Sequence, residues 1–263
     1  MIEVTSRDNP LLKSIRRLVQ DANAYRKQGH IWLEGDHLCR AALERGVQPL
    51  QVVLTPSVLS SDPVAWREWS DKVVVVSDAL FATLSGLESP AQMGFLLDYT
   101  PALSLDSQAA TVILDRVQDA GNVGSILRSA SAFGFKQVLA LKGTAALWSA
   151  KVLRAGMGAH FGMHLVEGAS LEQVAQLSVP VITTSSHQGP FLHELLFHGR
   201  LPTACAWAFG HEGQGVSSEL MAMAQSQVRI AQPGGEESLN VASAAAICLQ
   251  ASSMAALALG LKA

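Results

Sequence analysis

The sequence predicts an α/β protein with a mainly parallel sheet, because short apolar runs alternate with helical segments along its second half. Of the 263 residues, 49% are hydrophobic, which is enough to form a substantial core. In such sheets helices cover both faces, and ligands bind beyond the carboxyl ends of the strands. Strands rich in branched residues are expected at 111–115, 137–141, 164–166, 181–185, 204–209 and 228–231.

The first hundred residues predict a smaller α/β unit. A helix should begin at Asn9-Pro10 and run to about Asp21, since proline is tolerated in the first helical turn. Ser77 is placed to cap a short helix that ends near Leu84. A further helix is expected at 36–44, and strands at 51–55, 73–77 and 95–99.

A linker is expected at residues 100–108, where Pro101 and several Ser and Asp residues show no period. This divides the chain into a first domain over 1–100, a linker over 101–108 and a second domain over 109–263. The final helix, expected at 238–257, is rich in alanine. Its small side chains indicate close packing against another helix, from the same chain or from a second subunit.

Composition argues against several classes of protein. The formal net charge of -3 does not suit a protein that coats nucleic acid non-specifically. Apolar stretches such as 73–76 and 242–249 are too short to span a membrane, and the first twenty residues carry charges where a signal peptide needs an apolar core. We therefore expect a cytoplasmic protein with no membrane partner. Three widely spaced cysteines, Cys39, Cys205 and Cys248, predict buried reduced thiols.

Positive charge is concentrated near the N-terminus. Six basic and two acidic residues lie between Arg7 and Lys27, a local balance of +4. This pattern is typical of a surface that faces phosphates, and equally of a solvated helix face.

Three glycine-containing loops follow expected strands. In the first, Asn122 stands at a helix start, where it either caps the helix or contributes to a site. Arg128 follows within a helix of small and apolar residues, where a guanidinium should need a partner. A permanently charged fork of this kind suits a phosphate.

The second loop spans residues 210–215 and holds three glycines around Glu212, so that its backbone can approach a ligand closely. The third spans 230–240 and ends in Ser238 and Asn240, two short polar residues that either cap the last helix or bind. None of the three loops is specific by itself.

Two other motifs carry less weight. The glycines of 156–162 resemble a dinucleotide fingerprint, but they follow a charged, helix-like run where that fingerprint needs an apolar strand. His193 and His198 are five residues apart, so their rings diverge by roughly 140° on a helix and cannot share a metal. No metal site is expected.

Together and in order, the three loops resemble the SpoU (TrmH-like) branch of the SPOUT RNA methyltransferases, from about Thr111 to the C-terminus. The first 100 residues are similar to the substrate-binding domain often fused to this family, through Glu34-Gly35 and residues 41–43. The residues that match the three motifs are Asn122 and Arg128, then 210–215 with Glu212, then Ile230 and Ser238-Leu239-Asn240.

The resemblance implies a C-terminal trefoil knot, which general topology rules would have rejected. It also implies a homodimer with its active site near the subunit interface. S-adenosylmethionine would bind in the knot, largely through backbone groups at the positions of Gly210, Ile230 and Leu239.

The implied reaction moves a methyl group from that cofactor to a ribose 2'-hydroxyl of RNA, with ribosomal RNA favoured over tRNA because of the extra N-terminal domain. The hydroxyl must be aligned and must lose its proton. By resemblance, Arg128 would contact the target phosphate, and whether it also accepts the proton is open. The positioning residues would be Asn122, Glu212, Ser238 and Asn240.

Two departures from the family pattern concern loop geometry. Ala120 stands where proline is common, and Ala231-Gln232 replaces a frequent Pro-Met pair. A non-catalytic RNA-binding relative is one alternative, but it would be expected to lack Asn122, Arg128, Glu212 or Ser238. An NAD(P)-dependent oxidoreductase built on the Gly156 loop is the other.

Overall fold

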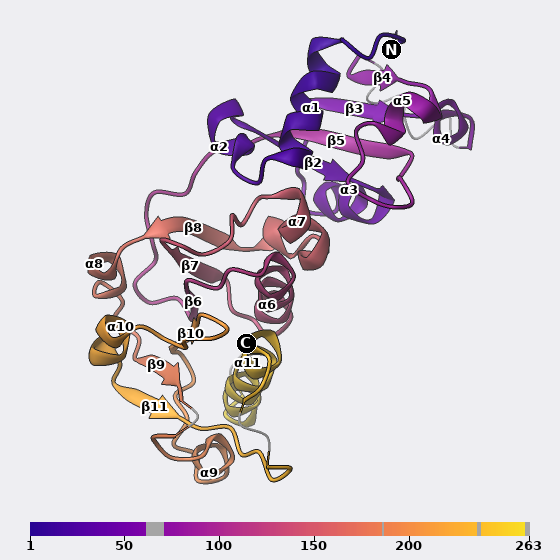
Figure 1. Ribbon diagram of the computed structural model, residues 1–263. Helices are drawn as coiled ribbons and strands as arrows, with labels where there is room; N and C mark the ends of the chain where they lie inside the picture. Colours follow the sequence, from indigo (N-terminus) through magenta and orange to yellow (C-terminus); the bar gives the residue numbers. More distant parts are fainter. Residues whose placement is uncertain (62–70, 186, 236–237, 261–263) are drawn as a thin grey trace. The chain divides into compact units, whose positions relative to one another are not determined.

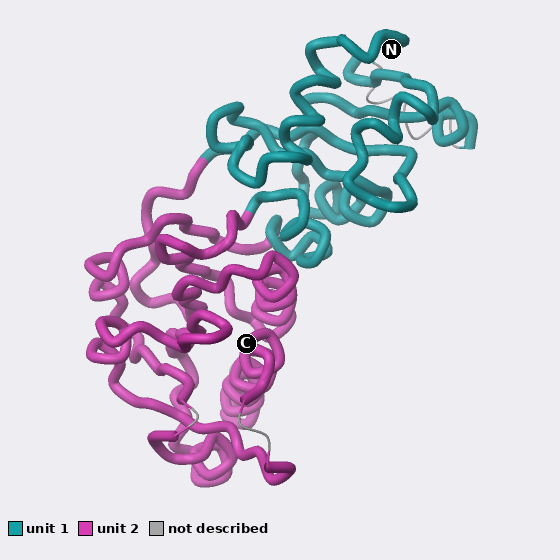
Figure 2. The backbone as a smooth tube through the Cα atoms, in the orientation of Figure 1, with its two compact units in different colours: residues 1–100, 148–161 teal, residues 101–147, 162–263 magenta. Residues whose placement is uncertain are grey.

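The computed structural model describes residues 1–61, 71–185, 187–235 and 238–260. The chain divides into two compact units (Figure 2): Met1–Thr100 with Trp148–Phe161, and Pro101–Leu147 with Gly162–Ala263. The segment Trp148–Phe161 therefore packs with the first unit, whereas the sequence placed it in the second domain.

A five-stranded mixed sheet forms the first unit, in the order β1-β4-β3-β5-β2. β4 pairs in parallel with β1 and β3, and β5 is antiparallel to β3 and β2. The three strands expected here are present. The strands are β1 (Ile2–Glu3), β2 (His30–Glu34), β3 (Gln51–Leu54), β4 (Val73–Val75) and β5 (Met93–Asp98).

Helix α1 (Pro10–Gln20) follows directly from its sequence. The Asn9 side chain accepts a hydrogen bond from the Leu11 amide at 2.9 Å, and Pro10 occupies the first helical turn. Leu12, Ile15 and Leu18 recur on one face and are buried. The remaining helices of this unit are α2 (Ala24–Gln28), α3 (Asp36–Leu43), α4 (Pro56–Ser61), α5 (Asp78–Ala82) and α7 (Ala150–Gly156).

Long-range contacts explain why the segment containing α7 joins the first unit. Helix α7 packs against β2. The Trp148 ring lies 6.2 Å from the Tyr99 ring and 5.1 Å from the His160 ring, between ring centroids. Tyr99 and Trp148 are about fifty positions apart, and β2 and α7 more than a hundred, so a local pattern in the sequence could not reveal these two contacts.

The second unit contains a six-stranded, wholly parallel sheet in the order β11-β9-β10-β6-β7-β8. All six expected strands are present, although β11 lies two residues earlier than expected and β8 runs three residues further. The strands are β6 (Thr111–Asp115), β7 (Gln137–Leu141), β8 (His164–Ala169), β9 (Val181–Thr184), β10 (Ala206–Gly210) and β11 (Ser226–Val228).

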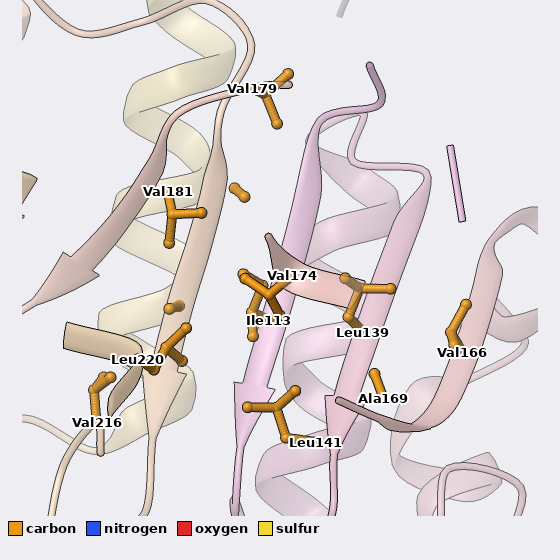
Figure 3. Close-up of a cluster of buried hydrophobic side chains, with 12 residues drawn as sticks. Ile113, Leu139, Leu141, Val166, Ala169, Val174, Val179, Val181, Val216 and Leu220 are labelled. Carbon is orange, nitrogen blue, oxygen red and sulfur yellow. The ribbon is translucent and has the colours of Figure 1, made fainter. Parts of the chain in front are cut away.

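Helices cover both faces of this sheet, as the α/β prediction requires (Figure 1). On one face, Ile113, Leu139 and Val181 pack with Val174 of α8 and Leu220 of α10 in a buried cluster (Figure 3). On the other, the Trp207 indole of β10 donates to the Ser252 hydroxyl of α11 at 2.8 Å. The helices are α6 (Ala120–Ala132), α8 (Leu171–Val174), α9 (Leu192–Phe197), α10 (Ser218–Met223) and α11 (Val241–Ala258).

Helix α11 begins three residues after the expected position, with Asn240 as its N-cap. Its 18 residues have a mean hydropathy of 1.6, which by length and composition alone would suffice for a membrane span. The apolar stretch 242–249 is too short to span a membrane, but the whole helix that contains it is not. In the structure α11 packs against α6, α9 and β10.

The three cysteines are free and buried, as expected. Burial raises the pKa of the Cys205 thiol to about 12, against a smaller opposing effect from the Ser252 hydroxyl, and also raises the pKa values of Cys39 and Cys248. All three are protonated near neutral pH and have the character of small core residues.

Candidate active site

The first two glycine-containing loops lie side by side because β6 and β10 are neighbouring parallel strands. Their register places Gly210 opposite Asp115, so both strands end at the same edge of the sheet. The buried Asp115 carboxylate accepts the Ser217 amide at 2.6 Å and the Arg116 Nε at 3.1 Å. This carboxylate therefore ties the end of β6 to the far end of the second loop.

Glu212, at the centre of the second loop, reaches across to the first. Its carboxylate accepts the backbone amides of Gln118 at 3.2 Å and Asp119 at 3.1 Å, and the Asn122 Nδ2 at 3.1 Å. Desolvation raises the pKa of Glu212, but the hydrogen bonds from Asn122 and the backbone outweigh it, so that the pKa lies below its usual value. Glu212 is ionised at neutral pH, and we interpret it as a positioning residue.

Asn122 is not the cap of α6. That position belongs to Asp119, whose side chain accepts the Asn122 amide at 2.7 Å. The Asn122 side chain is thereby free to bond in both directions: it donates to Glu212 and accepts from Asn240 Nδ2 at 3.0 Å.

Asn240 brings the third loop into the same arrangement. As the N-cap of α11, its Oδ1 accepts the amides of Ala242 and Ser243 at 2.9 and 3.2 Å. A continuous chain of hydrogen bonds, Glu212–Asn122–Asn240, therefore joins all three loops. Ser238, two residues before Asn240 in the sequence, lines a cavity.

The sequence predicted that the Arg128 guanidinium needs a protein partner, but the described part of the structure provides none. It lies on the exposed side of α6 and makes no hydrogen bond or ion pair with the described residues. Water solvates it, so its burial penalty is small. Its charge is available to a ligand.

A cavity lies between the loops that follow β9 and β11 and the start of α11. It holds about 480 Å³ of empty space, part of which is open to solvent. Ile230 and Leu239, two of the three expected cofactor-binding residues, line it. The described residues that line it are Thr184, Ser185, Ile230, Gln232, Ser238, Leu239 and Ala244.

Gly210, the third expected cofactor residue, is not among these lining residues. A Cβ at this position would lie 2.0 Å from the Gly215 carbonyl carbon and 2.1 Å from the Val216 nitrogen. The loop closes so tightly because His211 and Gly215 exchange two backbone hydrogen bonds, at 3.0 and 2.8 Å. The geometry of the loop itself therefore requires the glycine, whether or not a ligand is present.

Sequence reasoning missed Thr184 and Ser185 in the cavity and Asp115 between the loops. A signal existed, because each lies at or directly after the carboxyl end of a parallel strand, where ligands of such sheets bind. Hydroxyl and carboxyl side chains at those ends therefore indicate a site as glycines do.

The dinucleotide alternative loses its structural basis. Gly156 is the last residue of α7, a helix, and Met157 caps that helix in the left-handed conformation with a φ of 48°. A dinucleotide fingerprint needs a strand before its glycines. Within the described residues, no group of three His, Cys, Asp or Glu is arranged to hold a metal ion.

The fold and the three joined loops define a class of α/β enzyme with its site at the carboxyl edge of a parallel sheet. The model of the SpoU rRNA Methylase family matches residues 109–250, and that of the MRM3-like substrate binding domain matches residues 9–94. The chain belongs to the SpoU rRNA methylase family, which confirms the resemblance drawn from the motifs.

Relatives match over nearly the whole chain. The 23S rRNA (guanosine(2553)-2'-O)-methyltransferase RlmP of Bacillus subtilis is 28% identical, over 94% of this chain and 97% of that protein. An uncharacterized tRNA/rRNA methyltransferase of Synechocystis is 31% identical, over 94% and 91%.

Solved structures also match both units. An rRNA methyltransferase from Sinorhizobium meliloti has a TM-score of 0.80 at 25% identity, covering 96% of this chain and 97% of that one. An RNA 2'-O ribose methyltransferase has a TM-score of 0.76 at 25% identity, covering 97% and 100%.

Proposed function

We propose that this protein methylates a ribose 2'-hydroxyl of ribosomal RNA and takes the methyl group from S-adenosylmethionine. The observation that carries the proposal is the Glu212–Asn122–Asn240 chain of hydrogen bonds, which fixes three loops beside the cavity of Ile230 and Leu239. Family membership supports it, as do the activities for which RlmP and the mitochondrial rRNA methyltransferase 3 of mouse are named. Transfer RNA is the alternative substrate.

The residues present suit the cofactor. Ile230 and Leu239 offer apolar faces to a purine, while Thr184, Ser185 and Ser238 offer hydroxyl groups to its polar edges. When bound, the cofactor supplies a methyl group made electrophilic by its positively charged sulfur. The closed 210–215 loop is the second motif, and it would contact the rest of the molecule through backbone groups that His211 and Gly215 do not use to close it.

The chain's own residues then align the nucleophile. In the transfer, a bond forms between the 2'-oxygen and the methyl carbon, the carbon–sulfur bond breaks with its electrons remaining on sulfur, and the hydroxyl proton leaves to a base. We assign Arg128 to the phosphate of the target nucleotide, because its guanidinium is exposed and makes no bond to the described residues. Water and a transiently deprotonated Arg128 are the two candidates for the base.

A knotted chain end is part of the proposal, and contacts around Arg229 support it. After β11, the Arg229 amide donates to the Pro190 carbonyl at 2.9 Å, and the Arg229 carbonyl accepts the Leu192 amide at 2.8 Å. A Cβ on Gly189 would lie 2.0 Å from the Gln227 carbonyl oxygen, so the segment before α9 passes directly over the end of β11. Further along the chain, Asn240 bonds Asn122 of α6, and α11 packs against α6. These contacts are consistent with a chain end that is threaded under the segment before α9.

We further propose that the basic face of the first unit guides RNA. Arg7, Lys13, Arg17, Arg26 and Lys27 are exposed. Reversing charge with Arg17→Glu and Lys27→Glu should weaken binding of ribosomal RNA and reduce the slope of log affinity against log salt by about 2 in filter binding, since two phosphate contacts are lost. An unchanged slope would contradict this guiding role.

Calorimetry separates the proposed class from the alternatives. The wild-type chain should bind S-adenosylhomocysteine, the product of the cofactor, and should not bind NAD⁺ or NADP⁺. Binding of a dinucleotide alone would support an oxidoreductase. Binding of ribosomal RNA without S-adenosylhomocysteine would indicate a non-catalytic relative.

A further inference from the structure

A second cavity lies beyond the carboxyl ends of β6, β7 and β8, three neighbouring strands of the parallel sheet (Figure 1). It holds about 830 Å³ of empty space, which includes space open to solvent. Asp115, Leu141 and Ala169, the last residues of the three strands, line it, and its described lining lies within the second unit. Ligands of parallel sheets bind at this edge, but the proposed cofactor occupies only the half formed by β9 and β11.

Two basic residues, Arg116 and Lys142, line this cavity. They directly follow β6 and β7, which pair in parallel, so their backbones are neighbours. A Cβ on Gly143 would lie 3.2 Å from the Arg116 Cγ, so the stem of the arginine passes over the residue after Lys142. The Lys142 side chain is exposed and makes no hydrogen bond or ion pair with the described residues. Its charge is therefore available to a ligand.

The backbone of Arg116 is strained. Its φ is 62°, and among the described residues only Met157 shares a positive φ without being glycine. The Arg116 amide donates to the Thr144 hydroxyl at 3.1 Å, and that hydroxyl donates to the Leu114 carbonyl at 2.9 Å. These bonds hold the strained conformation in place. Glycine would adopt it without strain, so a long cationic side chain at this position indicates a use for the side chain.

The Arg116 guanidinium is held in place but is not fully used. Its Nε donates to the Asp115 Oδ1 at 3.1 Å and its Nη1 donates to the Gln214 Oε1 at 3.0 Å. Its Nη2 makes no hydrogen bond with the described residues, and the side chain is 32% exposed, so one edge of the fork remains open to an anion. Gln214 belongs to the same loop as Glu212, so this guanidinium lies next to the proposed active site.

Two carboxylates also line the cavity, Asp115 and Glu219. Asp115 is buried and both of its oxygens are engaged, one by Arg116 and the other by the Ser217 amide. Glu219 is exposed, and hydrogen bonds from its own amide and from the Ser218 hydroxyl keep its pKa below the usual value. Glu219 is therefore ionised at neutral pH and would repel an anion in this cavity, so removal of its charge should favour an anionic ligand.

We infer that Arg116 and Lys142 form a subsite for a backbone phosphate of the RNA, other than the phosphate assigned to Arg128. The inference rests on the proposed function, because it adds a second contact to the same substrate. Neighbouring strands lie about 4.8 Å apart, so the ends of β10 and β7, which are two strand positions apart, are separated by about 10 Å. An RNA strand whose target nucleotide lies at the Glu212 loop reaches this cavity with a neighbouring nucleotide.

Filter binding of ribosomal RNA over a range of salt concentrations tests the inference. Lys142→Gln is the main variant, because the exposed Lys142 side chain has no partner among the described residues and the fold does not depend on it. Lys136→Gln is the matched control. Lys136 is also exposed but directly precedes β7, so the same charge is lost at the opposite edge of the same sheet.

Two further variants test the charges around the subsite. Arg116→Asn removes the second cation, and asparagine tolerates the left-handed backbone. Glu219→Gln removes the carboxylate that would repel a phosphate. Thermal unfolding of each protein checks that the fold is retained.

Lys142→Gln should weaken RNA binding on the order of fivefold and reduce the slope of log affinity against log salt by about 1, because one phosphate contact is lost. Arg116→Asn should act in the same direction. Lys136→Gln should keep the wild-type slope, and Glu219→Gln should bind RNA more tightly than wild type. Lys142→Gln should bind S-adenosylhomocysteine as wild type does, because the cofactor cavity lies at the other half of the sheet edge.

Three results would overturn the inference and leave the proposed function intact. The first is an equal RNA affinity and salt slope for Lys142→Gln and Lys136→Gln. The second is weaker RNA binding by Glu219→Gln, which would indicate a ligand group that donates to the carboxylate, such as a base. The third concerns a free phosphate ion: Lys142→Gln would lose binding of inorganic phosphate in calorimetry but keep the wild-type RNA affinity.

Failure of the proposed function has a different signature. A wild-type chain that binds neither ribosomal RNA nor S-adenosylhomocysteine would contradict the proposed function itself, and the inference with it.

Discussion

Glu212 shows how a single carboxylate can organise the site. It accepts three N–H groups from the first loop, and one of them belongs to Asn122, which in turn bonds Asn240. The sequence could not reveal these partners, because the backbone amides that Glu212 accepts are more than ninety positions away.

The stability provided by Glu212 should depend on pH. Its pKa in the folded chain lies below the unfolded value of about 4.3, so its contribution is present above that pH and is lost as pH falls through the folded pKa. Glu212→Gln should therefore unfold at lower urea than wild type at pH 7, and the gap should narrow below about pH 4. Circular dichroism measures both midpoints.

Glu3→Gln changes the same charge on an exposed residue of the other unit and should show no such gap. A gap for Glu212→Gln that stays constant from neutral to acidic pH would contradict the assigned role.

The residues of the site could be predicted individually, but their partners could not. For both Asn122 and Asn240, the sequence allowed two roles, as a helix cap or as part of a binding site. In the structure Asp119 takes the cap of α6, whereas Asn240 both caps α11 and bonds Asn122. Arg128 was expected to need a partner, but its exposure depends on which side of α6 faces the sheet, and the helix has small and apolar residues on several sides.

Among the elements, the tight loop after β10 determines the position of Glu212. Gly210→Ala would drive a Cβ into the Gly215 backbone at 2.0 Å. We expect this substitution to cost about 3 kcal/mol of unfolding free energy and to weaken binding of S-adenosylhomocysteine, because the loop must open.

Gly213→Ala is the matched control in the same loop. Its Cβ would approach nothing closer than the His211 ring at 3.8 Å. Its unfolding free energy should stay within about 0.5 kcal/mol of wild type. If both substitutions lowered the unfolding free energy equally, the close approach of the Gly215 backbone would not be the reason that position 210 requires glycine.

Element boundaries were predictable where the local signal was strong. Asn9-Pro10 gives both the cap and the first turn of α1, and the parallel strands of the second unit are continuous apolar runs. Strand β2 was missed, because its five residues are stabilised by full-length pairing with β5, some sixty positions away. The start of α11 was placed early because Ser238 resembles a cap, whereas Asn240 is the cap.

At the scale of the whole molecule, the outer face of α11 remains apolar. Exposed side chains on it include Ile247 at 41%, Met254 at 47% and Leu257 at 61% of their accessible area. We propose that a second copy of the chain covers this face, as the resemblance implies. Only 33% of the residues of α11 are buried, although the helix is apolar on every side. A homodimer would account for this, because the partner would cover the exposed apolar side chains.

Met254→Glu with Leu257→Glu should convert a dimer into a monomer, because paired carboxylates cannot be buried without cations. Size-exclusion chromatography with light scattering measures the mass. Leu103→Glu is the control, since Leu103 is 83% exposed but lies outside α11. A wild-type chain that is monomeric at micromolar concentration would contradict the homodimer.

One boundary between the two compact units falls after Thr100, where the loss of periodicity predicts a linker. The return of Trp148–Phe161 to the first unit was not predictable, because it depends on rings that meet only in the folded chain. The knot is likewise beyond any local pattern, and the resemblance alone implied it.

The most direct test of the central claim locates the transferred methyl group. Total RNA from cells that lack this protein is incubated with the chain and S-adenosylmethionine labelled on its methyl carbon, then digested to nucleosides and analysed by mass spectrometry. The label should appear on the ribose of one nucleoside from ribosomal RNA with wild type, and should fall at least about a hundredfold with Arg128→Ala, which loses a charged contact to the target phosphate. Label on a base, or no label in any RNA, would contradict ribose methylation.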